Sequence, residues 1–119
     1  MQEYLKEFRA LQISKADLQQ AIGEDLYNVE CSKACPLKCS HVVNAIRLYR
    51  NQTITLNALV DWVNVVWFTE LFVFRDEETD SIVSVLEVLE TMDEDDVVVS
   101  ESDLDSMVTA LNSNVEYIA

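Results

Sequence analysis

Glycine and proline are almost absent from this chain: Gly23 and Pro36 are the only examples in 119 residues. A sheet protein reverses its direction often, and its tight turns rely on glycine, proline and Asn-Gly pairs. Helices need fewer reversals and can be joined by short polar connections. Half of the residues are apolar, so a chain of this length can bury a real core. The sequence therefore predicts one all-α domain over residues 1–119, a bundle of five or six helices.

Apolar residues recur at helical spacing in six segments, several of which follow a residue that favours a helix N-cap. Ser14, Ser40 and Thr55 are the expected N-caps of the second, third and fourth helices. Thr79 or Asp80 opens the fifth helix, and Ser100 or Ser102 caps the last. The predicted helices cover about residues 4–11, 14–26, 40–50, 56–70, 79–89 and 100–111.

Three segments do not follow the helical pattern. Residues 28–40 hold all three cysteines and are expected to be irregular. In residues 71–74, Phe72 and Phe74 flank the β-branched Val73, a pattern typical of either a short extended segment or a helix end. Residues 97–99 are three consecutive valines, which are also compatible with an extended segment. The predicted bundle therefore has room for one short extended segment.

Charge is distributed very unevenly along the chain. Residues 1–75 contain 8 Asp and Glu and 8 Lys and Arg, whereas residues 76–119 contain 14 Asp and Glu and no Lys or Arg. The two parts carry net charges of 0 and −14, which together give the formal −14 of the chain. An acidic half repels nucleic acid and anionic lipid and attracts basic proteins and cations. We expect no nucleic-acid partner and no membrane partner.

Two dense groups of carboxylates flank the fifth predicted helix. Their members are Asp76, Glu77, Glu78 and Asp80 before the helix, and Asp93, Glu94, Asp95 and Asp96 after it. Carboxylates are favourable at the N-terminal end of a helix and unfavourable at its C-terminal end. The second group also lacks a cation nearby in the sequence, so it indicates a partner that supplies positive charge. The alternative is a solvated acidic face.

Charge alone rarely gives tight binding, because a few desolvated anchor residues usually supply most of the affinity. Trp67, Phe72 and Phe74 are the candidate anchors beside the first acidic group, although each also fits the core. Trp67 and Phe68 point to different faces of the fourth predicted helix, so one of the two is expected to be exposed. Together with the eight carboxylates, these three aromatic residues form the predicted partner-binding site.

Calcium is one alternative use of the carboxylates. Asp76, Glu78 and Asp80 alternate as in an EF-hand loop, and Glu87 stands at the twelfth position. Ser81, however, occupies the position where the sharp turn needs glycine, and the apolar residues that follow are spaced as a helix. We therefore predict no calcium site and keep calcium binding as an alternative function.

Zinc is the second metal alternative. Cys31, Cys35, Cys39 and His41 offer four suitable ligand types. Their spacing differs from the usual structural motifs, no second cysteine pair exists, and Pro36 prevents one helix from presenting all three thiols. We interpret these residues as small buried side chains in an irregular turn, and we predict that the protein has no metal and no cofactor. A metal-binding helical module remains an alternative.

No catalytic pattern is present, and the chain is predicted not to be an enzyme. It lacks a glycine-rich phosphate loop, an HExxH motif and a Gly-x-Ser-x-Gly motif, and His41 is its only histidine. The N-terminal residues mix charged and apolar types, unlike a signal peptide. The most apolar window, residues 54–74, includes several polar groups that are costly in a bilayer. We expect a soluble, cytoplasmic protein.

The second half of the chain resembles a known family. The runs ITLNALVDWVNVVW (54–67), IVSVLEVLE (82–90) and VSESDLDSM (99–107), joined by acidic links, are similar to small helical bacterial immunity proteins. These proteins pair with contact-dependent growth inhibition toxins and colicin-like nuclease toxins. The resemblance covers about residues 50–112 and consists of a pattern of residue types.

The resemblance implies a toxin inhibitor that acts through protein-protein interaction. Nuclease toxins are basic because they grip phosphates, so an acidic inhibitor can cover their substrate site. Opposite charge also speeds the encounter. The partner implied is a basic toxin domain with nuclease activity, and the alternative is an acidic adaptor for some other basic protein.

Overall fold

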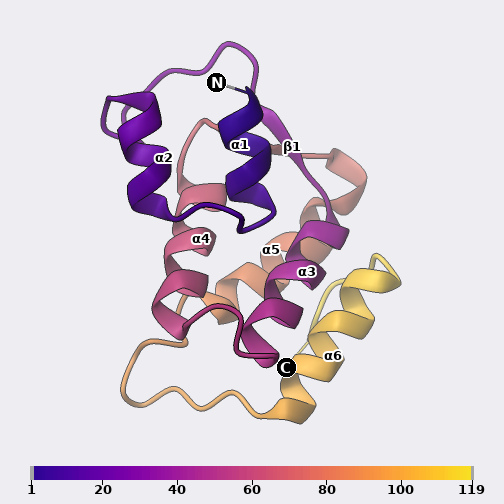
Figure 1. The fold of residues 1–119 in the computed structure, drawn as a ribbon. Helices are drawn as coiled ribbons and strands as arrows, with labels where there is room; N and C mark the ends of the chain where they lie inside the picture. Colours follow the sequence, from indigo (N-terminus) through magenta and orange to yellow (C-terminus); the bar gives the residue numbers. More distant parts are fainter. Residues whose placement is uncertain (1, 119) are drawn as a thin grey trace.

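The apolar stripes of the sequence fold as α-helices, as predicted. The computed structural model describes residues 2–118, and Figure 1 shows its arrangement. The α-helices are α1 (Gln2–Arg9), α2 (Lys15–Ile22), α3 (Cys39–Arg50), α4 (Leu56–Phe68), α5 (Thr79–Leu89) and α6 (Glu101–Asn112). The remaining elements are two short strands, β1 (Cys35–Leu37) and β2 (Phe72–Phe74), and the 3₁₀ turn η1 (Asp76–Glu78).

Side-chain caps explain where several helices begin. The Ser14 hydroxyl accepts a hydrogen bond from the Asp17 amide (3.1 Å), and the Asp17 carboxylate accepts one from the Ser14 amide (3.2 Å). Ser100 and Asp103 form the same reciprocal pair, so Ser100 rather than Ser102 caps α6. Each reciprocal pair satisfies two amides that the first turn of a helix leaves without partners. The Thr55 hydroxyl accepts from the Ala58 amide, as predicted for α4.

All six helices contribute to one hydrophobic core. Trp62 lies at its centre with no exposed surface, and its indole nitrogen donates to the Arg9 carbonyl oxygen (3.2 Å). Fully buried or nearly fully buried residues from the other helices include Leu5, Phe8, Leu18, Ile46, Ile82, Leu86, Leu104 and Met107. The predicted single-domain bundle is therefore confirmed. Among residues 2–118, none of the helices has both the length and the apolar composition needed to cross a membrane.

Two extended segments replace the single one that the sequence allowed. β2 covers residues 72–74, which settles the open alternative at the end of α4 in favour of a strand. It pairs in parallel with β1, with Cys35 opposite Phe72 and Leu37 opposite Phe74. The expectation of an irregular segment over residues 28–40 was therefore wrong for β1. Residues 97–99 form no strand.

The third predicted helix begins earlier than expected. The sequence predicts Ser40 as its N-cap, but α3 starts at Cys39 and Lys38 occupies the cap position. The fourth helix ends at Phe68, two residues before the predicted end. In Figure 1, β2 leads across the upper part of the molecule to η1, and α5 runs down from there to the loop over residues 90–100. α6 returns beside α3, against which it packs.

Candidate functional site

The two acidic groups lie at opposite ends of α5. The first acidic cluster (Asp76, Glu77, Glu78 and Asp80) occupies η1 and the first turn of the helix, and the acidic loop (Asp93–Asp96) follows the end of the helix. The 11 residues of α5 separate them by about 16 Å of helix at 1.5 Å per residue. Figure 1 shows η1 in the upper part of the molecule and the loop at the bottom. The fold therefore does not join the two groups into one patch.

Glu78 of the first acidic cluster stabilises the fold. Its Oε1 accepts a hydrogen bond from the backbone amide of Cys39 at 2.9 Å, and its side chain is only 16% exposed. The amide belongs to the first turn of α3, so the carboxylate caps that helix from a distant part of the chain. This bond, which favours the charged form, lowers the pKa of Glu78. Glu78 is therefore not an unpaired charge.

Arg75 also reduces the free charge of the first acidic cluster. Its guanidinium nitrogens lie 3.9 Å from a carboxylate oxygen of Glu77 and 3.9 Å from one of Glu78. Arg75 is the last residue before the acidic half of the chain. It partly neutralises Glu77 and Glu78, although the count of charges in the acidic half does not include it. Asp76 and Asp80 are exposed and form no ion pair with any residue between 2 and 118.

His41 provides a second cap at the same helix end. Its Nδ1 accepts a hydrogen bond from the Lys38 amide at 2.8 Å, so this nitrogen must be unprotonated. Burial, with Arg9 and Lys38 nearby, lowers the pKa of His41 to about 4. The positive end of α3 also disfavours a charged imidazole. Sequence reasoning assigned the cap to residue 40 and missed both His41 and Glu78.

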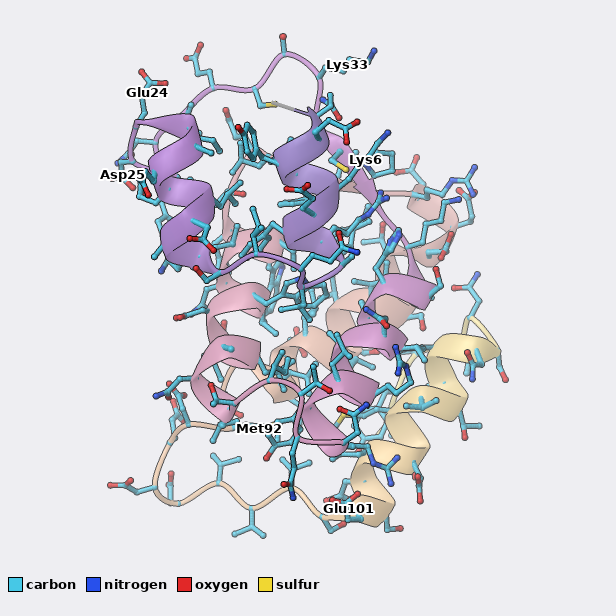
Figure 2. All side chains as sticks on the ribbon, viewed as in Figure 1. Lys6, Glu24, Asp25, Lys33, Met92 and Glu101 are labelled. Carbon is cyan, nitrogen blue, oxygen red and sulfur yellow. The ribbon has the colours of Figure 1, made fainter. Side chains whose placement is uncertain are left out.

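The acidic loop has different surroundings. Its four carboxylate residues are all exposed, and none forms an ion pair with a residue between 2 and 118. Two backbone hydrogen bonds shape the segment, from the Glu94 amide to the Thr91 carbonyl (3.0 Å) and from the Val97 amide to the Glu94 carbonyl (3.2 Å). In Figure 2, the labelled Met92 immediately precedes the acidic loop, and the labelled Glu101 is the first residue of α6, to which the chain leads. The loop presents its charge to solvent.

Val98 is the most exposed large apolar residue of the described chain, with 88% of its surface accessible. It follows the acidic loop by two residues, whereas the adjacent Val97 and Val99 are half-buried. An exposed apolar side chain beside unpaired carboxylates suits a basic partner whose surface also has an apolar part. The carboxylates can bind its positive charges, and the valine can pack against its apolar part. The three consecutive valines indicated an apolar segment in the sequence. Which valine is exposed could not be predicted, because it depends on which of them face the core.

Other carboxylates of the acidic half are paired within the protein. The Nε atom of Arg50 lies 2.9 Å from an oxygen of Glu101, and its Nη1 lies 2.7 Å from an oxygen of Asp105. These ion pairs join the end of α3 to the start of α6. Of the carboxylates within residues 2–118, those of the acidic loop are the densest group that forms no ion pair.

The three aromatic residues predicted as anchors are too buried to insert into a partner. Phe72 is 6% exposed and packs near Phe8, with ring centroids 6.2 Å apart. Trp67 and Phe74 are half-buried against the core. Phe68, which is 49% exposed, is the accessible member of the pair with Trp67, and the two rings stack at 4.6 Å. All these residues precede η1 in the chain, so at least 18 residues separate each of them from the acidic loop.

Burial makes two of the three cysteines poor nucleophiles. All three are free thiols, with Cys35 and Cys39 buried and Cys31 half-buried. Burial raises the pKa of both Cys35 and Cys39, although the Arg9 guanidinium donates to the Cys35 sulfur at 3.4 Å. A raised pKa keeps a thiol protonated and poorly nucleophilic at neutral pH.

Neither metal alternative gains support from the geometry. Between residues 2 and 118, no three His, Cys, Asp or Glu side chains come together in a way that could hold a metal ion. The segment compared with an EF-hand is helical from Thr79 onward, whereas a calcium loop must wrap its oxygens around the ion.

Comparisons with protein-family models, with curated proteins and with solved structures found no match for this chain. The resemblance to helical immunity proteins stays an expectation from the sequence. The exposed residues and their chemistry are therefore the basis for a functional proposal.

Proposed function

We propose that this protein is an immunity protein that binds and blocks a basic toxin domain. We propose further that the toxin domain is a nuclease, because nucleases are basic where they bind the phosphates of their substrate. The observation that carries the proposal is the acidic loop, which holds four exposed carboxylates without any cation from residues 2–118. These charges lie close together and repel one another, so the free protein gains no stability from them. A basic partner would relieve that repulsion.

Binding begins with electrostatic attraction. A net charge of −14 draws a basic protein toward the acidic half, and opposite charges can raise association rates far above those of neutral pairs. A nuclease is positively charged where it holds the phosphates of its substrate. Carboxylates can occupy the same cationic positions, and the bulk of the bundle then excludes nucleic acid. No reaction is required of the inhibitor.

Val98 supplies the apolar part of this surface. It is exposed in the free protein and adjoins the acidic loop, so it can enter a shallow apolar site on the partner. The first acidic cluster contributes long-range attraction through Asp76 and Asp80, but Glu78 is committed to α3. The interface is therefore centred on residues 93–98 rather than shared equally between the two ends of α5.

An acidic adaptor that binds some other basic protein would use the same surface. The test must therefore measure protection from a toxin, and not only binding to a basic protein. The test produces a basic nuclease toxin domain in bacteria from an inducible promoter. The candidate is any such domain encoded by a gene that flanks the gene of this protein, and the absence of one would count against the immunity function. Co-expression of the natural protein should restore growth, and purified protein should inhibit nucleic-acid cleavage by the toxin in proportion to complex formation. Growth arrest and cleavage that persist at excess inhibitor would reject the immunity function.

Two variants with equal net charge test the acidic loop. The loop variant combines Asp93→Asn, Glu94→Gln, Asp95→Asn and Asp96→Asn. The control variant combines Glu3→Gln, Glu24→Gln, Glu30→Gln and Asp61→Asn, four exposed carboxylates elsewhere that form no ion pair within residues 2–118. Protection should be weakened by the loop variant and kept by the control. Equal protection by both would show that the loop is not the binding surface.

A further inference from the structure

An apolar groove runs between α3 and α6, on a part of the molecule that the proposed toxin surface does not use. Its volume is about 400 Å³. Its apolar walls come from Val43 and Ile46 of α3 and from Val108 of α6. Ile46 is fully buried, while the two valines are half-buried against the core. Figure 1 shows these helices side by side.

Helical spacing places cations along the same side of α3. Arg47 and Arg50 line the groove together with Asn51, because residues three and four positions apart share one helix face. Arg50 is neutralised by Glu101 and Asp105, at 2.9 and 2.7 Å. Arg47 forms no ion pair with any carboxylate between residues 2 and 118. The usable positive charge of the groove therefore belongs to Arg47.

Arg47 is held in place by its neighbour. Its Nη2 donates a hydrogen bond to Asn44 Oδ1 at 2.7 Å. That bond orients the guanidinium and leaves the Nε and Nη1 donors without a partner among residues 2–118. A planar guanidinium with two free donors suits a carboxylate, which it can bind through two parallel hydrogen bonds.

We propose that this groove binds a small monocarboxylate with an unbranched apolar chain. The carboxylate pairs with Arg47, and the chain lies against Val43, Ile46 and Val108. The volume falls at the lower end of the roughly 300–1,000 Å³ typical of small-molecule sites, and it is too small for the face of a partner protein. An apolar lining with one convergent charged group is also the composition of such sites.

Two carboxylates of the acidic half, those of Glu101 and Asp105, lie beside the groove, where Arg50 neutralises them. At physiological ionic strength, charges more than about 8 Å apart in solvent are largely screened. A carboxylate in contact with Arg47 is within that distance, whereas the carboxylates of Glu101 and Asp105 are paired with Arg50. The local attraction therefore decides whether the anion binds.

The test is a titration of the ¹⁵N-labelled protein with sodium decanoate at physiological ionic strength and neutral pH, followed by backbone amide shifts in NMR spectra. We expect saturable shifts confined to residues that line the groove on α3 and α6. Decanol, which has the same chain without the charge, should bind at least about tenfold more weakly. Shifts spread over the whole protein, or no saturation, would overturn the proposal.

Substitutions at Arg47 identify the anchoring charge. Arg47→Gln should weaken decanoate binding about tenfold, and Arg47→Lys should recover part of the affinity because the charge remains. Lys33→Gln removes a cation from an exposed loop far from the groove and should change nothing. Arg47 is exposed, so these variants should keep the fold, which circular dichroism checks. Equal affinity for decanoate and decanol, or unchanged affinity in Arg47→Gln, would also overturn the proposal.

Discussion

The first acidic cluster and the acidic loop have nearly the same composition but different surroundings. In the cluster, Glu78 accepts the Cys39 amide and Arg75 lies within 3.9 Å of two carboxylates. In the loop, no carboxylate has a cationic partner from residues 2–118. The positions relative to the helices explain the contrast, because the cluster approaches the start of α3, whereas the loop extends away from the end of α5.

This difference shows that a run of acidic residues can serve two purposes that the sequence does not distinguish. A carboxylate near an unsatisfied backbone amide strengthens the fold, since it fills a position that water would otherwise occupy. A carboxylate in an exposed loop contributes to the electrostatic field instead. Substitutions at the two acidic groups can test this division, and the effects expected of them differ in size.

The largest effect should follow from neutralising the acidic loop. The loop variant defined above should lower the association rate with the basic toxin domain on the order of 10- to 100-fold at low ionic strength, because steering depends on local opposite charge. Its free energy of unfolding should stay within about 0.5 kcal/mol of the natural protein. Stopped-flow mixing and urea unfolding measure the two quantities. An equal loss of rate in the control variant would show that only net charge matters.

The next largest effect should be on stability and should come from the first acidic cluster. Glu78→Ala removes the carboxylate that caps α3, and we expect it to lower the free energy of unfolding by about 1–2 kcal/mol. Glu77→Ala is the matched control, because Glu77 lies equally far from Arg75 but caps no helix. Its cost should be below about 0.5 kcal/mol. Similar costs for both would contradict a capping role of Glu78.

Acid should destabilise the same helix end. The folded-state pKa of His41 is lowered from 6.5 to about 4, so between these values the unfolded chain binds a proton that the folded protein does not. Stability should therefore fall as pH drops from 6.5 to 4, by roughly 1 kcal/mol once solvent screening is allowed for. Glu78, whose pKa is also lowered, adds a further loss below its unfolded value of 4.5.

Urea unfolding at several pH values measures this effect. In His41→Gln, the loss between pH 6.5 and 5 should be smaller than in the natural protein, because the titrating group is gone. A stability that rises over that interval would contradict the assignment.

The smallest expected effect concerns Val98. Val98→Ser should weaken toxin binding about threefold, which corresponds to roughly 0.7 kcal/mol of lost apolar contact. The change should be in the dissociation rate, since the charge that steers association is untouched. Phe72→Leu is the comparison from the core and should leave binding unchanged while costing stability. Surface plasmon resonance with immobilised toxin domain separates the two rates, and an unchanged dissociation rate in Val98→Ser would exclude it as an anchor.

Local patterns in the sequence were sufficient to predict the helices and several of their ends. The apolar stripes identified the core faces, including fully buried Trp62. Ser14, Thr55 and Ser100 form the expected caps. Each of these features depends on residues three or four positions apart, and such pairs are in contact in any helix. The exposure of the acidic loop was also predictable, because a dense row of carboxylates cannot be buried without partners.

Contacts between distant residues could not be predicted in the same way. β1 forms because Cys35 and Leu37 pair with Phe72 and Phe74, which lie more than thirty positions away in the chain. A strand of three residues is too short to show a clear pattern in the sequence. Glu78 caps α3 across 39 positions, and the groove beside Arg47 exists only because α6 packs against α3. The sequence by itself determined which residues form helices and where the charge accumulates, because both are local properties. Only the tertiary structure decided which carboxylates are used within the fold and which remain for a partner, because that depends on which groups the packing brings together.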